Sequence, residues 1–207
     1  MPLPEKIVTS RIRRLRRAEL PTDTVELARY LVGKTLVHNL PSGRLTGRIV
    51  ETEAYVVGDA AAHSFRGLTP RNRALFLERG HAYVYFVYGC WSMMNVSSET
   101  RGIGAGVLLR ALEPLDGIEL MQRHRGTPRL HDLARGPGRL ASAMHIDRRF
   151  DGADLCAPGP VWLGSPVQSA GTIGESVRIG LTVEAHRVLR FYERGNPFVS
   201  GPNRLRE

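Results

Sequence analysis

The sequence predicts an α+β fold: a single domain built on an irregular, mostly antiparallel β-sheet with helices at its margins. Short segments with strand-like alternation outnumber the helical stretches, and Gly- or Pro-containing turns separate most of them. There is no internal repeat and no long linker, and 207 residues are ample for one hydrophobic core. We expect residues 1–17 to form a basic N-terminal arm and residues 18–207 to form the single domain.

The first segment is basic, and a helix follows it. The arm carries Arg11, Arg13, Arg14, Arg16 and Arg17. Such a run is typical of a solvated arm, and the alternative is an arm that follows a phosphate backbone. The helix is expected to begin at Asp23, an N-cap residue with Glu26 three positions on, and to stop at Gly33. Its apolar stripe is Val25, Ala28, Leu31 and Val32.

Two strands are predicted next, at Thr35–Leu40 and Arg44–Tyr55. Glu51 and Glu53 share one face of the longer strand because side chains repeat every second residue. Two carboxylates on one face are unusual in a core strand, since buried carboxylates need partners. The ordinary explanation is an exposed edge strand with solvated acids.

A long polar stretch, Gly58–Arg79, follows. It contains Arg66, Arg71, Arg73 and Arg79. A loop of this length in a compact domain is usually functional or mobile. His63 lies within it, and a lone histidine is more often structural than catalytic.

Aromatic side chains mark the next pair of strands, His81–Tyr88 and Ser92–Val96. Tyr83 and Tyr85 share a face, which most often means core packing with satisfied hydroxyls. Tyr88 lies on the other face, at a glycine-containing turn. There it is either an incidental surface tyrosine or a residue that stacks on, or wedges between, bases.

Ala105–Leu112 is predicted to be a mostly apolar strand interrupted by Arg110. A guanidinium in a central strand is costly unless a carboxylate pairs with it. Glu51 and Glu53 are the candidate partners.

The remaining elements are short. Pro114 is expected to open a helix over Leu115–His124. The Gly136–Arg139 entry into a helix over Leu140–His145 suits a phosphate near Arg139, although an ordinary turn explains this pattern about as well. Strands are expected at Val161–Leu163, Arg178–Val183 and Val188–Tyr192.

The net charge of +9 and the isoelectric point near 10.3 favour a polyanionic partner. No apolar run approaches a membrane span and no apolar signal core occurs, so we expect a cytoplasmic protein, nucleoid-associated or nuclear in a eukaryote. Cys90 and Cys156 lie far apart, which argues against a disulfide scaffold and a cysteine zinc site.

Several chemistries lack their motifs. A zinc base deaminase needs H-x-E with a later P-C-x-x-C, and neither occurs. The phosphate loop, H-E-x-x-H, the G-x-S-x-G elbow and dinucleotide fingerprints are also missing. The residue types that remain favour activation of water by a carboxylate base, with no metal or cofactor.

Six motifs in order resemble the alkyladenine (3-methyladenine) DNA glycosylase family, in its bacterial form. They are V-E-T-E-A-Y, A-A-H-S, T-P-R-N-R, Y-V-Y-F-V-Y-G, M-N-V-S-S and V-L-L-R-A-L-E-P. The likeness continues through G-P-G-R-L and R-F-Y-E-R-G-N-P-F-V-S and covers roughly residues 18–200. Cys90 and Trp91, together with two extra residues between Asn95 and Arg110, depart from the family pattern.

The resemblance implies a glycosylase that removes alkylated or deaminated purines from double-stranded DNA. Glu53 matches the family's general base, and Arg110 its partner in holding the nucleophilic water. Ile179 falls where the family places a backbone carbonyl on that water. Opposite charge would make Arg110 hold Glu53 ionised.

The resemblance also assigns a base pocket. Tyr55, His63 and Tyr85 match the walls that clasp the flipped base. Asn95 matches the residue that crowds the exocyclic amine of guanine. Tyr88 matches the residue inserted into the duplex in place of the base, which limits the cost of flipping.

The DNA backbone is expected to contact Arg71, Arg73 and Arg139, and we expect a monomer. No strand-cleaving lyase activity is predicted, because Lys6 and Lys34 are the only lysines and both lie outside the motifs. An alternative is a non-catalytic binder of damaged DNA or structured RNA with the same fold. A basic scaffold protein is a further alternative, but it would not explain the aromatic motifs.

Overall fold

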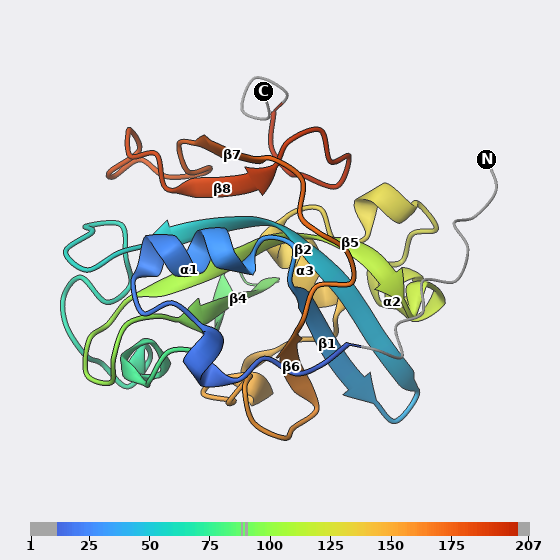
Figure 1. Ribbon diagram of the computed structural model, residues 1–207, viewed down its shortest axis with the longest axis horizontal. Coiled ribbons are helices and arrows are strands. Elements are labelled where there is room, and N and C mark those ends of the chain that lie inside the picture. Colours follow the sequence, from blue (N-terminus) through green and yellow to red (C-terminus); the bar gives the residue numbers. More distant parts are fainter. Residues whose placement is uncertain (1–11, 88, 90, 203–207) are drawn as a thin grey trace.

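The computed structural model describes residues 12–87, 89 and 91–202. The strands are β1 (Thr35–Leu40), β2 (Gly43–Tyr55), β3 (Ala82–Val87), β4 (Trp91–Ser97), β5 (Gly106–Asp116), β6 (Val161–Gly164), β7 (Ile173–Ser176) and β8 (Arg190–Glu193). They form one sheet in the order β3-β4-β5-β2-β1-β6, to which β8 joins at β2 and β7 joins at β8 (Figure 1). Every pairing is antiparallel. The predicted α+β class is confirmed.

The long strand β2 is the centre of the sheet. Its residues 43–48 pair with β1. Further along, residues 51–53 pair with β5 on one edge and β8 on the other. Glu51 and Glu53 therefore lie in the interior, with 0% of each residue exposed. The exposed-edge explanation of these carboxylates is wrong.

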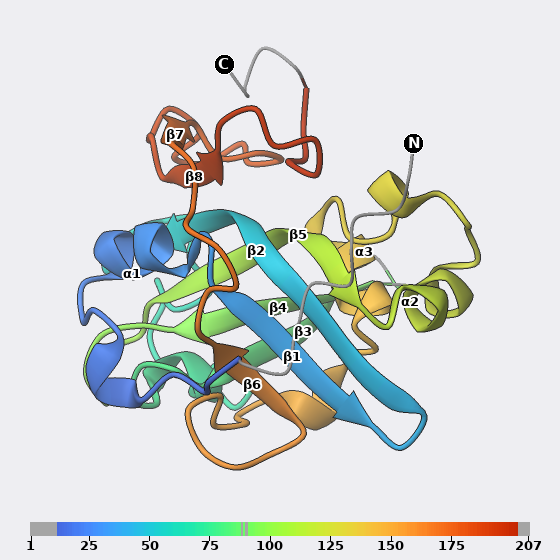
Figure 2. The same cartoon turned by 45° about the vertical axis from the view of Figure 1, so that its right-hand side comes forward.

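The helices are α1 (Thr24–Leu31), α2 (Ile118–Arg125) and α3 (Pro137–Ala143). Asp23 caps α1 as predicted, because its carboxylate accepts from the N–H groups of Val25 and Glu26, each at 2.9 Å. Figure 2 shows α1 at one end of the sheet and α2 beside α3 at the other. Apolar side chains from all three helices pack against the sheet in one large core. Among the described residues, no helix has the length and apolar character needed to cross a membrane.

The predicted helix start at Pro114 is wrong. Pro114 lies inside β5, opposite Gly47 and next to a register shift, where a missing N–H is tolerated. The chain turns three residues later at Gly117, whose φ of 73° is readily adopted only by glycine. The helix α2 therefore begins at Ile118, three residues later than predicted, whereas α3 begins at Pro137, three residues earlier than predicted.

The predicted strand over Arg178–Val183 is also wrong. These residues form no strand, and Gly180 within them has φ 82°. On the edge away from β2, β8 pairs instead with β7, a strand that was not predicted from the sequence. Its four residues are too short to show a clear alternation.

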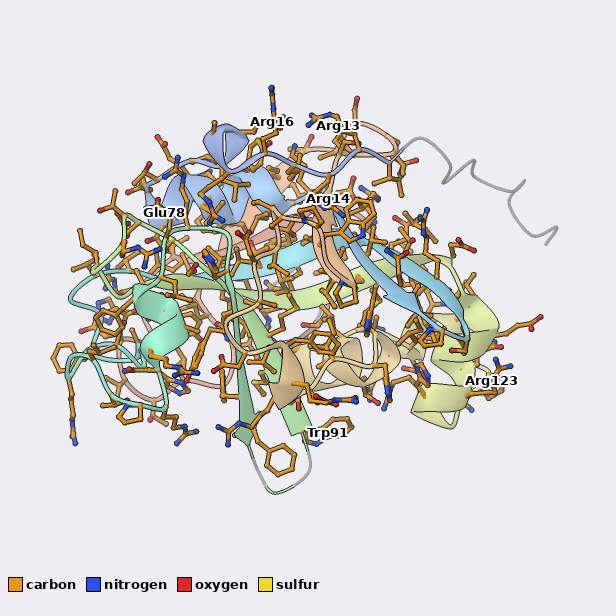
Figure 3. The ribbon with its side chains drawn as sticks, turned by 90° about the horizontal axis from the view of Figure 1, so that it is seen from below. Arg13, Arg14, Arg16, Glu78, Trp91 and Arg123 are labelled. Carbon is orange, nitrogen blue, oxygen red and sulfur yellow. The ribbon has the colours of Figure 1, made fainter. Side chains whose placement is uncertain are left out.

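The described part of the basic arm lies along β6. Leu15 is buried, and its N–H donates to the carbonyl of Leu163 at 2.9 Å. Arg13, Arg14 and Arg16 lie on the side of the molecule opposite the projecting β3–β4 hairpin, where Trp91 lies (Figure 3). Arg11 lies outside the described residues.

Candidate active site

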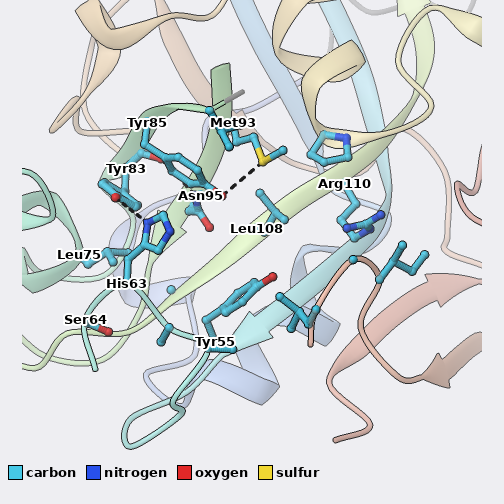
Figure 4. A pocket seen from close by; sticks show the side chains of 18 residues that line it. Tyr55, His63, Ser64, Leu75, Tyr83, Tyr85, Met93, Asn95, Leu108 and Arg110 are labelled. Atoms are coloured by element: carbon cyan, nitrogen blue, oxygen red, sulfur yellow. Dashed lines mark hydrogen bonds between the residues drawn. The ribbon is translucent and has the colours of Figure 1, made fainter. Parts of the chain in front are cut away.

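A cavity of about 360 Å³ opens beside the central strands. That volume lies at the lower end of the range for small-molecule sites and suits one base-sized ring system. Its walls come from β2, β3, β4 and β5, from the loop at residues 61–64 and from the segment at residues 179–181. Figure 4 shows Tyr55 across this cavity from His63 and Tyr85.

One wall is aromatic. The rings of Tyr83 and Tyr85 stack with centroids 5.3 Å apart, which confirms that the two side chains share a face. The His63 ring meets Tyr85 edge-on at 4.5 Å, and its Nδ1 lies 2.8 Å from the hydroxyl of Tyr83. Partial removal from water, and then Arg71, lower the pKa of His63. The imidazole is therefore neutral at physiological pH.

Asn95 lies on β4 between its two neighbouring strands, opposite Tyr83 of β3 and Leu108 of β5. It is 6% exposed and lines the cavity. Its Nδ2 donates to the carbonyl of Tyr83 at 3.4 Å. This bond and the two flanking strands fix the amide in the wall.

Glu53 lies directly behind the cavity wall, because three residues that line the cavity bond to its carboxylate. Oε1 accepts from the N–H of Ile179 at 2.7 Å and lies 3.1 Å from Nη1 of Arg110. Oε2 accepts from the hydroxyl of Tyr55 at 3.1 Å. Burial raises the pKa of Tyr55, so this hydroxyl remains a donor. Ile179 thus contacts the carboxylate through its N–H. The contact of its carbonyl with the nucleophilic water, which the resemblance implies, stays a prediction.

Glu51 has a different set of partners. Its Oε1 accepts from Nε of Arg110 at 2.9 Å and from Nε of Arg190 at 2.7 Å. Its Oε2 accepts from the N–H of Ser200 at 2.6 Å. The predicted pairing of Arg110 with both glutamates is confirmed. Glu51 joins the sheet to the C-terminal segment, whereas Glu53 faces the cavity wall.

The pKa values of the two carboxylates are shifted in opposite directions. Burial alone would raise the pKa of Glu51, but Arg110 and Arg190 outweigh it and lower that pKa. Burial raises the pKa of Glu53, and the bonds from Arg110 and Ile179 do not overcome it. Arg110 favours the ionised form of Glu53, as expected, but burial outweighs this contribution and the net pKa is raised. A glutamate with a raised pKa is a stronger base at the pH where it still ionises.

Most of the predicted site residues converge on this cavity: Tyr55, His63, Tyr85, Asn95, Arg110 and Ile179 all line it. Tyr88 lies outside the described residues, between Val87, which lines the cavity, and Gly89.

The three arginines predicted to meet DNA are exposed near the cavity. Arg71 lies close enough to affect the pKa of His63, and Arg73 begins the short helix that contains the lining residue Leu75. Arg139 lies on the first turn of α3, two residues from Pro137 of the lining, with its Nη1 3.1 Å from Asp132.

Sequence reasoning missed several residues of the site. Tyr83, Met93 and Leu108 line the cavity. Their alternation with Tyr85, Asn95 and Arg110 along the strands was a signal that could have identified them. By contrast, the buried pair of Arg178 and Asp59 joins residues 119 apart, and no local pattern indicates it.

Comparison with known proteins identifies this arrangement. A family profile described as Methylpurine-DNA glycosylase (MPG) matches residues 18–197. The chain belongs to the methylpurine-DNA glycosylase family. The resemblance inferred from the six motifs is thereby confirmed.

Individual proteins from other organisms also resemble the chain over most of its length. A protein of Mesorhizobium japonicum, provisionally named a 3-methyladenine DNA glycosylase, is 68% identical over 92% of each chain. A protein of Paraburkholderia phytofirmans with the same name is 52% identical over 92% of this chain and 90% of its own. One from the archaeon Methanocella arvoryzae is 46% identical over 86% and 90%.

Proposed function

We propose that this protein is a DNA repair glycosylase that flips a damaged purine out of duplex DNA and hydrolyses its N-glycosidic bond, leaving an abasic site. The substrates would be 3-methyladenine and other alkylated purines, with hypoxanthine and etheno-adenine as further candidates. The observation that carries this proposal is the carboxylate of Glu53, buried behind an aromatic cavity and bonded to three residues of its wall.

In the proposed reaction, Glu53 accepts a proton from a water molecule while the water oxygen attacks C1′ of the flipped nucleotide. The C1′–N bond breaks and its electron pair leaves with the base. The negative charge of Glu53 also stabilises the electron-deficient sugar as that bond lengthens. Arg110, which lines the cavity and contacts Glu53, would orient the water.

The cavity suits an alkylated purine with a positive charge. The faces of Tyr55 and Tyr85 would attract a cationic base, and stacking contributes about 1–3 kcal/mol per base. Because His63 is neutral, it adds no repulsion toward such a base. Asn95 would crowd the 2-amino group of guanine.

Extrusion of the base would depend on the surface around the cavity. Tyr88 would occupy the space that the base leaves in the duplex. Arg71, Arg73 and Arg139 would contact phosphates, and the net charge of +9 strengthens association at low salt. Nζ of Lys34 lies 4.1 Å from the ring centroid of Tyr30, and Lys34 is not part of the cavity lining. We therefore propose hydrolysis without lyase activity.

The test is a panel of duplexes, each with one defined lesion, assayed for abasic-site formation. We expect release of 3-methyladenine, and abasic sites that stay intact until alkali cleaves them. Tight binding to lesion duplexes with no abasic sites in any of them would favour the non-catalytic binder. Strand cleavage with a borohydride-trapped Schiff base would contradict the monofunctional assignment.

Excision should depend on pH through Glu53. Only the ionised carboxylate accepts a proton, so the rate falls as the pH drops through its pKa. Burial holds that pKa above the ordinary value of 4.5, and the loss should therefore begin at a higher pH than an exposed glutamate would give. Single-turnover rates on 3-methyladenine, which is cationic in the nucleotide and needs no protonation to leave, would measure this fall in rate at acidic pH. Circular dichroism over the same pH range would exclude acid unfolding, and a rate independent of pH down to 4.5 would contradict the assignment.

Asn95→Ala should change base selectivity. Removing the amide relieves the crowding of the 2-amino group, so excision of guanine-type bases should rise relative to adenine-type bases by about 10-fold or more. The measurement is the ratio of the two single-turnover rates. Asn39→Ala, which removes an exposed amide on β1, is the control and should leave the ratio unchanged. An unchanged ratio in Asn95→Ala would remove Asn95 from this role.

A further inference from the structure

The segment at residues 179–181 forms one wall of the cavity without belonging to any strand or helix. It nevertheless supplies the N–H of Ile179, which donates to Glu53 at 2.7 Å. A donor on such a segment keeps its place only if other contacts hold the backbone. The side chain of Arg178, immediately before Ile179, makes those contacts.

Arg178 is fully buried, and its guanidinium has three kinds of neighbour. Nη1 and Nη2 bond to the two carboxylate oxygens of Asp59, the second at 3.1 Å. Nη1 also donates to the carbonyl of Ala54 at 3.1 Å. The central carbon of the guanidinium, Cζ, lies over the ring of Tyr55, 4.7 Å from its centroid. A planar, bidentate cation is required for all three contacts at once.

Asp59 connects this arrangement to the opposite wall. Its Oδ1 accepts from the N–H of Ala61 at 3.0 Å, and its carbonyl accepts from the N–H of Ala62 at 2.9 Å. Ala61 and Ala62 line the cavity and lead directly into His63. The ion pair of Arg178 and Asp59 therefore joins two segments that close the pocket from separate parts of the chain.

We propose that Arg178 is a positioning residue, which with Asp59 clamps Tyr55 and the N–H of Ile179 in the geometry that Glu53 needs for excision. The proposal rests on the function proposed above. Arg178 acts through Tyr55 and Ile179, since it is not part of the cavity lining.

The cost of burying the pair supports a geometric role. A buried ion pair contributes little net stability, because desolvation of both charges offsets their attraction. In addition, Nε of Arg178 has no hydrogen-bond partner among the described residues. A well-packed apolar pair would stabilise the fold at least as well, but it could not hold Tyr55 and Ile179 in register with Glu53.

Loss of the contacts of Arg178 should also raise the pKa of Glu53. The groups facing that carboxylate are Arg110, Glu51, the hydroxyl of Tyr55 and the N–H of Ile179. The last two favour the ionised form and depend on Arg178. Their withdrawal raises the pKa of Glu53. The fall of the excision rate on acidification, which we call the acid limb of the pH profile, therefore shifts to higher pH.

The experiment compares Arg178→Met with Arg187→Met. Arg187 also approaches Asp59, at 4.0 Å, but it is partly exposed and belongs to neither the pocket nor the stack on Tyr55. We expect Arg178→Met to excise about 10- to 100-fold more slowly in single turnover, as small misplacements of catalytic groups do. Its acid limb should lie at higher pH, and its affinity for duplex with an abasic site should stay close to wild type. Arg187→Met should match the wild-type protein in all three measurements.

Arg178→Lys keeps the charge beside Asp59 and guards against a variant that fails to fold. Its ammonium cannot bond both carboxylate oxygens and stack flat on Tyr55, so it should also show slower excision and a shifted limb. Folded Arg178 variants that keep the wild-type excision rate and the wild-type pH dependence would overturn the proposed positioning role of Arg178. A wild-type protein that excises no lesion would instead overturn the proposed function, so the two failures are distinguishable.

Discussion

Replacing Glu53 with glutamine should abolish excision while leaving affinity for lesion duplex nearly unchanged. Glutamine keeps the shape: its amide oxygen can still accept from the N–H of Ile179, and its amide N–H can donate to the Tyr55 hydroxyl in place of the carboxylate oxygen that accepted from it. It loses the ability to take a proton from water and the negative charge near the sugar. Removal of a general base typically costs about 10²–10⁴ in rate. Binding should persist, because it depends on phosphate contacts, stacking and the wedge.

The measurements are single-turnover release of 3-methyladenine and the dissociation constant for the same duplex. Glu51→Gln is the matched control, since it changes a carboxylate of the same strand with the same burial. In the folded Glu51 variant, most of the excision activity should remain. Loss of excision in folded Glu51→Gln together with activity in Glu53→Gln would show that Glu51, two residues earlier on the same strand face, is the catalytic base.

The sequence could indicate these two carboxylates but could not separate them by periodicity. Alternation places Glu51 and Glu53 on one face, and the structure brings both to Arg110. Their roles differ because of partners from distant segments. Arg190 and Ser200 bond to Glu51, whereas the N–H of Ile179 bonds to Glu53. Only the resemblance to a family favoured Glu53 before the fold was known.

The fold followed from the sequence where local signals were strong. The bounds of β1 were predicted to the residue, because Gly33 ends the preceding helix and a Pro-Ser-Gly turn follows the strand. Local signals failed where tertiary contacts override them. Pro114 looked like a helix start, but the sheet continues through it. The segment at residues 178–183 has strand-like composition. The buried ion pair with Asp59 and the bond to Glu53 nevertheless hold it in an irregular conformation in the cavity wall.

Glu51→Gln should cause a large loss of stability, because Glu51 bonds to Arg110, Arg190 and the N–H of Ser200. Glu51 is fully buried and neutralises two guanidinium groups. In the variant Arg110 still faces Glu53, and the fully buried Arg190 loses the negative charge of Glu51 while its bonds to Ser176 and Ser200 remain. Removing one partner of a buried ion pair typically costs about 3–5 kcal/mol, because the other charge stays buried without compensation.

Urea unfolding of wild type and variant at neutral pH would measure this loss, as a lower midpoint with an unchanged slope. Asp147→Asn is the control, since its ion pair with Arg149 is exposed, and its midpoint should stay close to wild type. The effect should also depend on pH. The pKa of Glu51 is lowered in the folded protein, so its contribution is present above the ordinary value of 4.5 and is lost as the pH falls through the folded pKa. The difference between wild type and Glu51→Gln should therefore shrink on acidification. A difference that stays constant or grows at low pH would show that Glu51 does not stabilise the fold as an ionised carboxylate.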